Sequence, residues 1–197
     1  MNYLKLKKIG KLYFGYEDIA RTLNITPQSA RVTANRYVQK GFLIRAKRNI
    51  YILTDRWIDL TPEQKFSIAN IIQTPSYISL MSALAYYEVT TQIQQSFIES
   101  VAVKRSKDVE LEQIYFNYIK INPELYSGFV RMHNFFIAAP EKAFLDAIYL
   151  KSYGRYQFDL SSLDFSKLKR QKLEQMAAMY PNKTKTYLKK NEYFSSA

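Results

Sequence analysis

The 197-residue chain contains no cysteine, a single histidine and only five glycines. Without cysteine there can be no disulfide, thiolate metal site or cysteine nucleophile, which favours a reducing, cytoplasmic location. No apolar run approaches the roughly 20 residues of a membrane span, and Met1–Lys11 lacks the apolar stretch of a signal peptide. The lone His133 and the scattered glycines form no catalytic set, metal constellation or phosphate-binding loop. We therefore expect a cytoplasmic protein without enzymatic activity, metal or cofactor.

Positive charge, in contrast, is abundant, and the net charge is +12. Residues 1–60 carry a net +8, residues 61–165 a net −2 and residues 166–190 a net +7. This uneven distribution predicts an anionic partner, because charge that serves only solubility is spread more evenly. For the C-terminal block, a merely solvated face is an equal alternative. The cations of that block form a candidate second basic surface: Lys167, Lys169, Arg170, Lys172, Lys183 and Lys185.

The pattern of apolar residues and turns predicts an α+β chain in two domains, residues 1–58 and 61–197, with a basic helical tail at 166–190. Thr61 and Gln64 form a capping box that opens the second domain, where a helix should run to about Ile72. The second domain should be mixed α/β, with helices at Ser79–Tyr87, from Pro140, after Gly154 and from Asn182, and strands at Phe97–Val103, Ile114–Ile119, Tyr126–Arg131 and Asn134–Ala138.

The segment 16–53 carries the strongest pattern. A short helix is followed by a turn at Asn24, and asparagine tolerates the left-handed conformation that such a turn needs. Thr26 and Pro27 then begin a second helix that ends at Gly41. The buried stripe of this second helix is Ala30, Ala34 and Tyr37. With the two strands that follow, this is the plan of a winged helix-turn-helix, whose second helix enters the major groove of DNA.

The exposed face of the second helix is suited to contacts with base edges: Gln28, Ser29, Arg31, Val32, Asn35 and Arg36. Glutamine and asparagine pair with adenine, and arginine pairs with guanine. The hairpin tip is cationic, and we expect Lys47, Arg48 and Asn49 to contact phosphate or the minor groove. These features predict binding to double-stranded operator DNA. A winged helix used only for protein contacts is the alternative.

Two segments further along the chain have distinctive sequences: PSYISLMSALAYY at 75–87 and AAPEKAFLDAIYL at 138–150. They resemble the YISLxSALxxxG helix and the APEKALLDLLYL segment of the abortive-infection AbiE-type antitoxin family. The hairpin, with Arg45 and Arg48-Asn49-Ile50-Tyr51, is similar to the N-terminal winged helix of that family. The resemblance covers about residues 10–150.

The resemblance implies the antitoxin of a type IV toxin–antitoxin system that defends against phage by abortive infection. Such a protein represses its own operon through the winged helix, and its second domain counters a nucleotidyltransferase-like toxin without requiring a stable complex. A homodimer on inverted repeats is common among such regulators, although no heptad marks one here. The chain departs from the family pattern at Asn49 and near Glu88, where the family has glycine.

Other chemical patterns have simpler interpretations. Lys142 and Asp146, four residues apart on the predicted helix, are expected to pair on the surface, and Asp108–Glu112 is expected to form a solvated edge and not a metal site. Aromatic residues such as Tyr115 and Phe116 are expected mainly in the core, with stacking on single-stranded RNA as the alternative.

The functional hypothesis is therefore a DNA-binding transcriptional autorepressor that acts as an antitoxin. One alternative is a winged-helix transcription regulator without a toxin, whose second domain senses a ligand or partner. The other is a protein-binding or RNA-binding adaptor built on the same fold.

Overall fold

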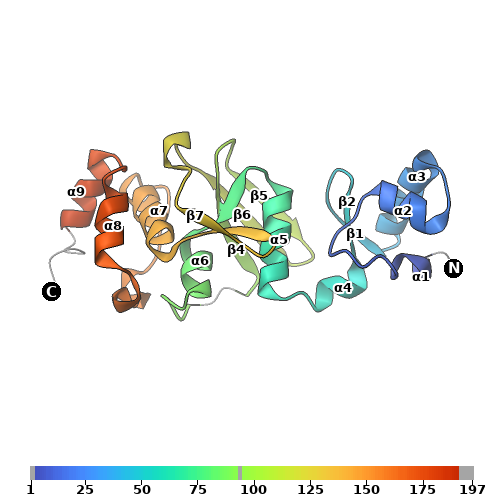
Figure 1. The fold of residues 1–197 in the computed structure, drawn as a ribbon, viewed down its shortest axis with the longest axis horizontal. Coiled ribbons are helices and arrows are strands. Elements are labelled where there is room, and N and C mark those ends of the chain that lie inside the picture. The colour runs from blue at the N-terminus through green and yellow to red at the C-terminus, as the bar shows by residue number, and fades with distance from the viewer. Residues whose placement is uncertain (1–2, 93–94, 191–197) are drawn as a thin grey trace. The chain divides into compact units, whose positions relative to one another are not determined.

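The computed structural model describes residues 3–92 and 95–190, and it divides into two compact units, residues 1–68 and 69–197 (Figure 1). The chain is a mixed α+β structure, as predicted. The first two and last seven residues of the predicted domains lie outside the described residues. In the described part of the chain, no helix is both long enough and apolar enough to cross a membrane.

The N-terminal unit consists of short helices and one hairpin. Its elements are α1 (Tyr3–Leu6), α2 (Tyr16–Leu23), α3 (Pro27–Gln39), the antiparallel strands β1 (Leu43–Lys47) and β2 (Ile50–Leu53), and α4 (Thr54–Ile58).

Local signals account for α2, α3 and the turn between them. Asn24 has the left-handed conformation, at φ 54° and ψ 53°, and the Thr26 side chain accepts a hydrogen bond from the Ser29 amide at the start of α3. Gly41, at φ +71°, lies just beyond the end of α3. The predicted turn, cap and stop are thus confirmed.

One hydrophobic core holds these elements together. Ala30 and Ala34 of α3 are fully buried and allow α2 to approach closely. Tyr3 of α1 stacks on Phe42 with 4.6 Å between ring centroids, and Tyr37 meets both rings edge-on. The position of α3 is therefore fixed by close packing, which leaves its opposite face free.

The C-terminal unit is built on a six-stranded mixed sheet. The strand order is β5-β6-β4-β3-β8-β7, with β3 (Ser76–Ile78), β4 (Phe97–Ala102), β5 (Lys107–Leu111), β6 (Ile114–Lys120), β7 (Phe129–Met132) and β8 (Phe135–Ala138). Strands β4 and β6 run parallel, as do β3 and β8, and the other neighbours are antiparallel.

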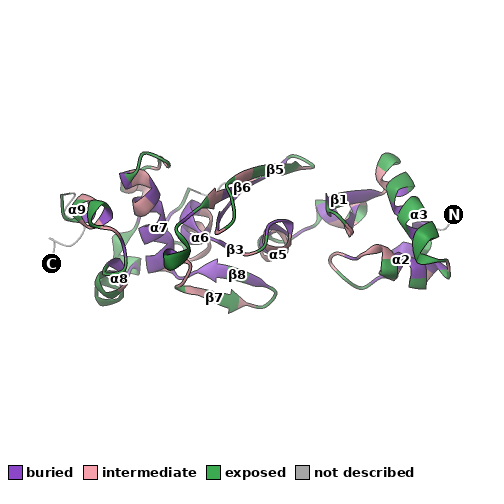
Figure 2. Ribbon diagram, turned by 90° about the horizontal axis from the view of Figure 1, so that it is seen from above, coloured by how far each residue is buried: buried purple, intermediate pink, exposed green. Residues whose placement is uncertain are grey.

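Helices complete this unit. They are α5 (Pro62–Ile72), which begins in the N-terminal unit, α6 (Leu80–Tyr86), α7 (Pro140–Ser152), α8 (Arg170–Ala177) and α9 (Asn182–Lys190), with 3-10 turns at Pro123–Leu125, Leu160–Ser162 and Phe165–Lys167. The predicted capping box of α5 is present, because Thr61 and Gln64 exchange both hydrogen bonds. Helix α6 packs against β4 and α7, and α8 and α9 both pack against α7. Nearly all of α7 is buried (Figure 2).

Two predicted boundaries are wrong. The strand expected from Tyr126 begins only at Phe129, because a 3-10 turn precedes it and Gly128 has a left-handed φ of +73°. The helix expected directly after Gly154 begins only at Arg170. Between them, Asp159 and Asp164 cap two 3-10 turns by accepting amide hydrogen bonds from serines two residues later.

Candidate nucleic-acid interface

The face of α3 that points away from the core is exposed along its whole length, as Figure 2 shows. Its apolar member, Val32, is 61% exposed, and Arg36 lies over the Tyr37 ring at 5.7 Å. The exposed residues are those expected from the sequence: Gln28, Ser29, Arg31, Val32, Asn35 and Arg36. Five of these six side chains are polar or charged, so this face presents mainly hydrogen-bonding groups.

The β1–β2 hairpin presents the second group of expected residues. Arg45 lies directly opposite Tyr51 in the register, and the register shifts between Arg45 and Lys47. Lys47 and Arg48 are exposed at the tip. Asn49 has a left-handed φ of 60°, so it fills the backbone role that glycine has in the related pattern.

The Asn49 side chain also ties the hairpin to the start of α2. Its Oδ1 accepts a hydrogen bond from the Tyr16 amide at 2.8 Å, and its Nδ2 donates to Glu17 Oε2 at 3.1 Å. The bond from Asn49 lowers the pKa of Glu17 below its ordinary value. A Cβ at Gly15 would lie 2.7 Å from that carboxylate and 3.2 Å from the Asn49 amide, so a larger residue there would displace the Glu17 side chain. The hairpin tip is therefore held in place.

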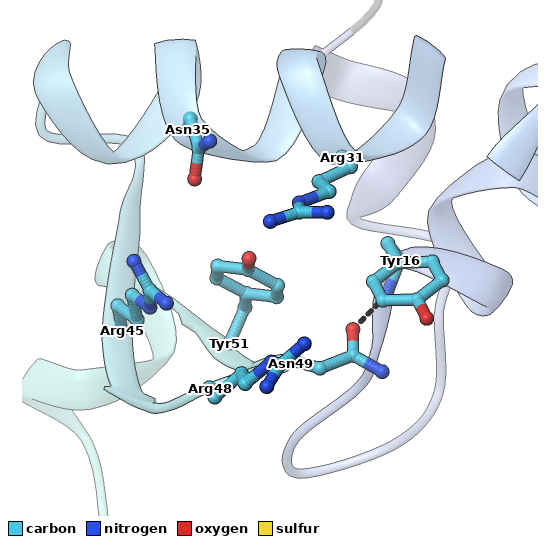
Figure 3. Close-up of a pocket in the computed structure, with 7 residues that line it drawn as sticks. All are labelled: Tyr16, Arg31, Asn35, Arg45, Arg48, Asn49 and Tyr51. Carbon is cyan, nitrogen blue, oxygen red and sulfur yellow. Dashed lines mark hydrogen bonds between the residues drawn. The ribbon is translucent and has the colours of Figure 1, made fainter. Parts of the chain in front are cut away.

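Between α3 and the hairpin lies a cavity of about 340 Å³. Figure 3 shows Arg31 and Asn35 reaching into it from α3, while Arg45, Arg48 and Tyr51 come from the hairpin. We call this the arginine cavity, and its lining residues are Tyr16, Arg31, Asn35, Arg45, Arg48, Asn49 and Tyr51.

The charge of the arginine cavity is uncompensated. Within residues 3–92 and 95–190, none of its three arginines forms an ion pair. Elsewhere in the N-terminal unit, by contrast, Lys7 pairs with Asp55 at 2.5 Å and Lys11 with Asp18 at 2.6 Å. Among the described residues, three arginines without ion pairs therefore lie together where α3 and the hairpin meet.

Sequence reasoning assigned no binding role to three residues of the arginine cavity, Tyr16, Arg45 and Tyr51, although Arg45 and Tyr51 belong to the hairpin segment that carries the resemblance. Arg45 was recoverable from the alternation of β1, which buries Ile44 and Ala46 and exposes the arginine between them. Alternation gives no such signal for Tyr51, because three successive residues of β2 are buried.

Comparison with known proteins defines the fold alone. No family model and no curated protein sequence matches the chain. Its structure is similar to the crystal structure of the RV2827C protein from Mycobacterium tuberculosis, with a TM-score of 0.59. The two sequences are 11% identical, and the match covers 94% of this chain and 72% of the other. At that identity the likeness concerns architecture and not chemistry.

The candidate second basic surface is exposed but partly neutralised. Lys167 pairs with Glu88, Arg170 with Glu174, and Lys172 with Glu141. Lys183 lies over the Tyr153 ring at 4.7 Å. Lys169 is exposed and Lys185 half-buried. The net charge of this block therefore overstates the potential that it presents to solvent.

The predicted surface pair of Lys142 and Asp146 is wrong, because both side chains are buried on α7. Asp146 accepts hydrogen bonds from Lys142, Tyr77, Ser79 and Tyr180, at 2.6 to 2.9 Å. The Lys142 ammonium also donates to Tyr180 and to the Leu125 carbonyl, each over 2.7 Å. A charged pair can be buried here because every polar atom has a partner. We call these residues the α7 polar cluster.

The remaining residues singled out from the sequence do not line the arginine cavity. His133 is exposed in the β7–β8 turn, and Asp108 lies on the edge strand β5 and accepts a hydrogen bond from Asn117 at 2.6 Å. Phe116 is buried, whereas Tyr115 is 48% exposed. Glu88 has a left-handed φ of 58°, so the backbone after α6 keeps the glycine-like turn despite the substitution. Among the residues described, no group of three or more His, Asp or Glu side chains is arranged to hold a metal ion.

Proposed function

We propose that this protein is a DNA-binding transcriptional autorepressor in which α2, α3 and the β1–β2 hairpin act as a winged helix-turn-helix. In this proposal α3 lies in the major groove of double-stranded operator DNA and the hairpin contacts the neighbouring backbone. The observation that carries it is the placement of three arginines without ion pairs, among the described residues, directly beside the exposed polar face of α3. Phosphate contacts beside a surface of hydrogen-bonding side chains are what duplex recognition requires.

In this proposal the exposed face of α3 makes the contacts with the bases. Gln28, Val32 and Arg36 are spaced four residues apart, so they lie along one line of the helix. The amide of Gln28 suits adenine, the methyl groups of Val32 suit the thymine methyl, and Arg36 suits guanine. In this proposal the protein acts in the cytoplasm and binds DNA as a homodimer when its operator is an inverted repeat.

We further propose that the C-terminal unit makes the protein the antitoxin of a type IV toxin–antitoxin system. The support is the resemblance of segments 75–87 and 138–150 to the AbiE-type family. Both segments contribute to the α7 polar cluster, through Tyr77 and Ser79 in the first and Lys142 and Asp146 in the second. The proposed partner is a nucleotidyltransferase-like toxin, which need not form a stable complex.

The DNA-binding proposal is tested by measuring affinity for the DNA upstream of its own gene and for random duplex over a salt series. We expect tighter binding to the upstream DNA and a log–log salt slope set by the number of phosphates contacted, about −0.9 for each. Absence of binding to either duplex at low salt would overturn the proposal.

Co-expression with a neighbouring nucleotidyltransferase gene tests the antitoxin proposal. We expect growth to be restored by the wild type and also by Gln28→Ala, whose substitution affects α3 alone. Failure of rescue by folded wild-type protein would leave a regulator without a toxin as the better description.

A further inference from the structure

We propose that the arginine cavity binds one tetrahedral phosphate group, which in the function proposed above is a phosphodiester of the duplex backbone. This inference rests on that proposed function for the source of the phosphate, and it adds a defined site and a set of ligands. It also reassigns Arg31, which sequence reasoning placed on a guanine, to the DNA backbone.

The charge of the cavity matches an oxyanion. Arg31, Arg45 and Arg48 approach it from two directions, from α3 and from the hairpin (Figure 3). Guanidinium groups are the side chains best suited to phosphate, because their planar N–H donors match its oxygens. Glu17, an acid close to the site, is engaged by Asn49 and does not line the cavity. An anion there would therefore meet three cations and no carboxylate among the described residues.

Tyr51 supplies a neutral hydrogen-bond donor beside the three arginines. Its ring is part of the hydrophobic core, and the residue is only 2% exposed. Its hydroxyl points into the cavity toward Arg31 and Asn35, as Figure 3 shows. The hydroxyl is not among the buried polar atoms of the described residues that lack a partner, so it is open to solvent and available to a ligand. A phosphate oxygen would accept a hydrogen bond from it.

The cavity has room for a phosphate group, and its walls are held in place. Its volume of about 340 Å³ lies at the lower end of the range of about 300–1,000 Å³ for small-molecule sites. The Asn49 hydrogen bonds to Tyr16 and Glu17 fix the hairpin side, and the buried alanines of α3 fix the other. The donors are thus in place before binding, which lowers the entropic cost of association.

This placement divides the exposed face of α3 in two. Arg31 and Asn35 lie on the side that faces the hairpin, as Figure 3 shows. Gln28, Val32 and Arg36 lie along the adjacent line and do not line the cavity. Backbone contact and base contact are therefore made by different edges of one helix.

The test uses the full chain and three variants with duplex DNA over a salt series. Tyr51→Phe removes only the hydroxyl, Arg45→Gln removes one charge from the cavity, and Lys8→Gln removes one exposed charge outside it. We expect Arg45→Gln to weaken binding to random and upstream duplex about tenfold and to reduce the salt slope by about 1. Tyr51→Phe should weaken both about tenfold with an unchanged slope, and Lys8→Gln should change affinity less than about twofold.

If both cavity variants behave like Lys8→Gln while the wild type binds duplex, the phosphate site is overturned and the DNA-binding proposal stands. If Arg31→Gln alters preference at one base pair and leaves random duplex unaffected, the assignment of Arg31 to the backbone is overturned. Circular dichroism and urea unfolding of Tyr51→Phe establish that the variant is folded.

Inorganic phosphate serves as the second probe. It distinguishes the two possible sources of the phosphate group, the duplex backbone and a small phosphate-bearing ligand. We expect it to perturb the arginine Nε–H resonances of the wild type in NMR spectra, and Tyr51→Phe to weaken that effect about tenfold. If wild-type protein binds inorganic phosphate in this way but no duplex, the site stands with a small phosphate-bearing ligand and the DNA-binding proposal falls. If inorganic phosphate leaves these resonances unchanged at millimolar concentration, the site is overturned as a general phosphate receptor.

Discussion

The Lys142 ammonium donates a hydrogen bond to the Asp146 carboxylate over 2.6 Å, and the two side chains are 2% and 0% exposed. The pair lies one turn apart on α7, at the point where β3, the segment after β6 and the α8–α9 connection meet through Tyr77, Leu125 and Tyr180. A buried pair of this kind contributes little net stability compared with apolar residues, yet the loss of one partner is costly.

Asp146→Ala should therefore destabilise the C-terminal unit by about 3–5 kcal/mol, since it leaves the Lys142 charge buried without its counter-ion. Lys142→Met should cost less, because Asp146 keeps the hydroxyl donors of Tyr77, Ser79 and Tyr180. Urea unfolding measures both. The matched control is Glu174→Ala, which removes an exposed pair with the same spacing and should cost less than about 1 kcal/mol. Equal costs at the two sites would contradict the role assigned to burial.

Glu141 should give the C-terminal unit an acid-dependent stability. Burial raises its pKa, but the ion pair with Lys172 and the hydrogen bond from the Lys169 amide outweigh burial and hold the pKa below the ordinary 4.5. The unfolded chain then binds the proton more tightly, so this contribution is full above about pH 4.5 and is lost as the pH falls through the lower folded pKa.

Glu141→Gln should accordingly cost about 1–3 kcal/mol at pH 7. The difference from wild type should shrink as the pH is lowered from 5 to 3. Urea unfolding at several pH values measures it, and a difference that stays constant with pH would argue against the ion pair as its origin.

These two cases indicate where sequence reasoning reaches its limit. Turns and caps such as Asn24, Thr26 and Thr61 were predictable because their chemistry is local. The burial of Asp146 was not, because two of its partners stand 69 and 34 residues away and an i,i+4 pair looks the same on an exposed helix.

The arginine cavity was also beyond prediction from the sequence, because it too depends on contacts between distant segments. The exposed face of α3 follows from helical periodicity, but the cavity requires side chains from α3, the hairpin and the start of α2 to converge. The three-residue strand β3 was likewise missed, because it is too short for an alternating pattern to stand out.

Gln28 and Lys47 should affect DNA binding in different ways. Gln28→Ala should relax the preference at one base pair by about 1–3 kcal/mol and leave random duplex unaffected. Lys47→Gln should weaken binding to every sequence and reduce the salt slope by about 1. Competition assays with a library of single-base variants measure the first effect. Equal behaviour of the two substitutions on all sequences would contradict the separation of base and backbone contacts.

Asn49→Gly should show what the side-chain hydrogen bonds of Asn49 contribute to DNA binding, because it keeps the backbone conformation of the hairpin. Glycine adopts the φ of 60° without strain, but it removes the side-chain bonds to the Tyr16 amide and Glu17. We expect the affinity for duplex to fall several-fold while the unfolding free energy changes by less than about 1 kcal/mol. Asn49→Ala, which retains a Cβ at the left-handed position, should in contrast lower stability as well. An unchanged affinity in Asn49→Gly would show that the anchor has no part in binding.

The basic C-terminal block should contribute little to DNA binding. Deleting it would remove Leu173, Tyr180 and Leu188 from the core, so neutralising its cations is the cleaner test. The double change Lys183→Gln and Lys185→Gln should leave the salt slope unchanged, whereas Lys47→Gln should reduce it. A reduction of about 2 in the double variant would instead establish a second DNA-binding surface.

Tyr51 places its ring in the core of the N-terminal unit and its hydroxyl in the arginine cavity. One side chain therefore links two equilibria, folding and occupancy, because the cavity exists only in the folded unit. Each tenfold increase of ligand concentration beyond its Kd adds about 1.4 kcal/mol to the free energy of unfolding. Copies seated on an operator would thus outlast free copies in the presence of cellular proteases. If the proposed function holds, the abundance of the protein would then adjust to the number of operator sites it occupies.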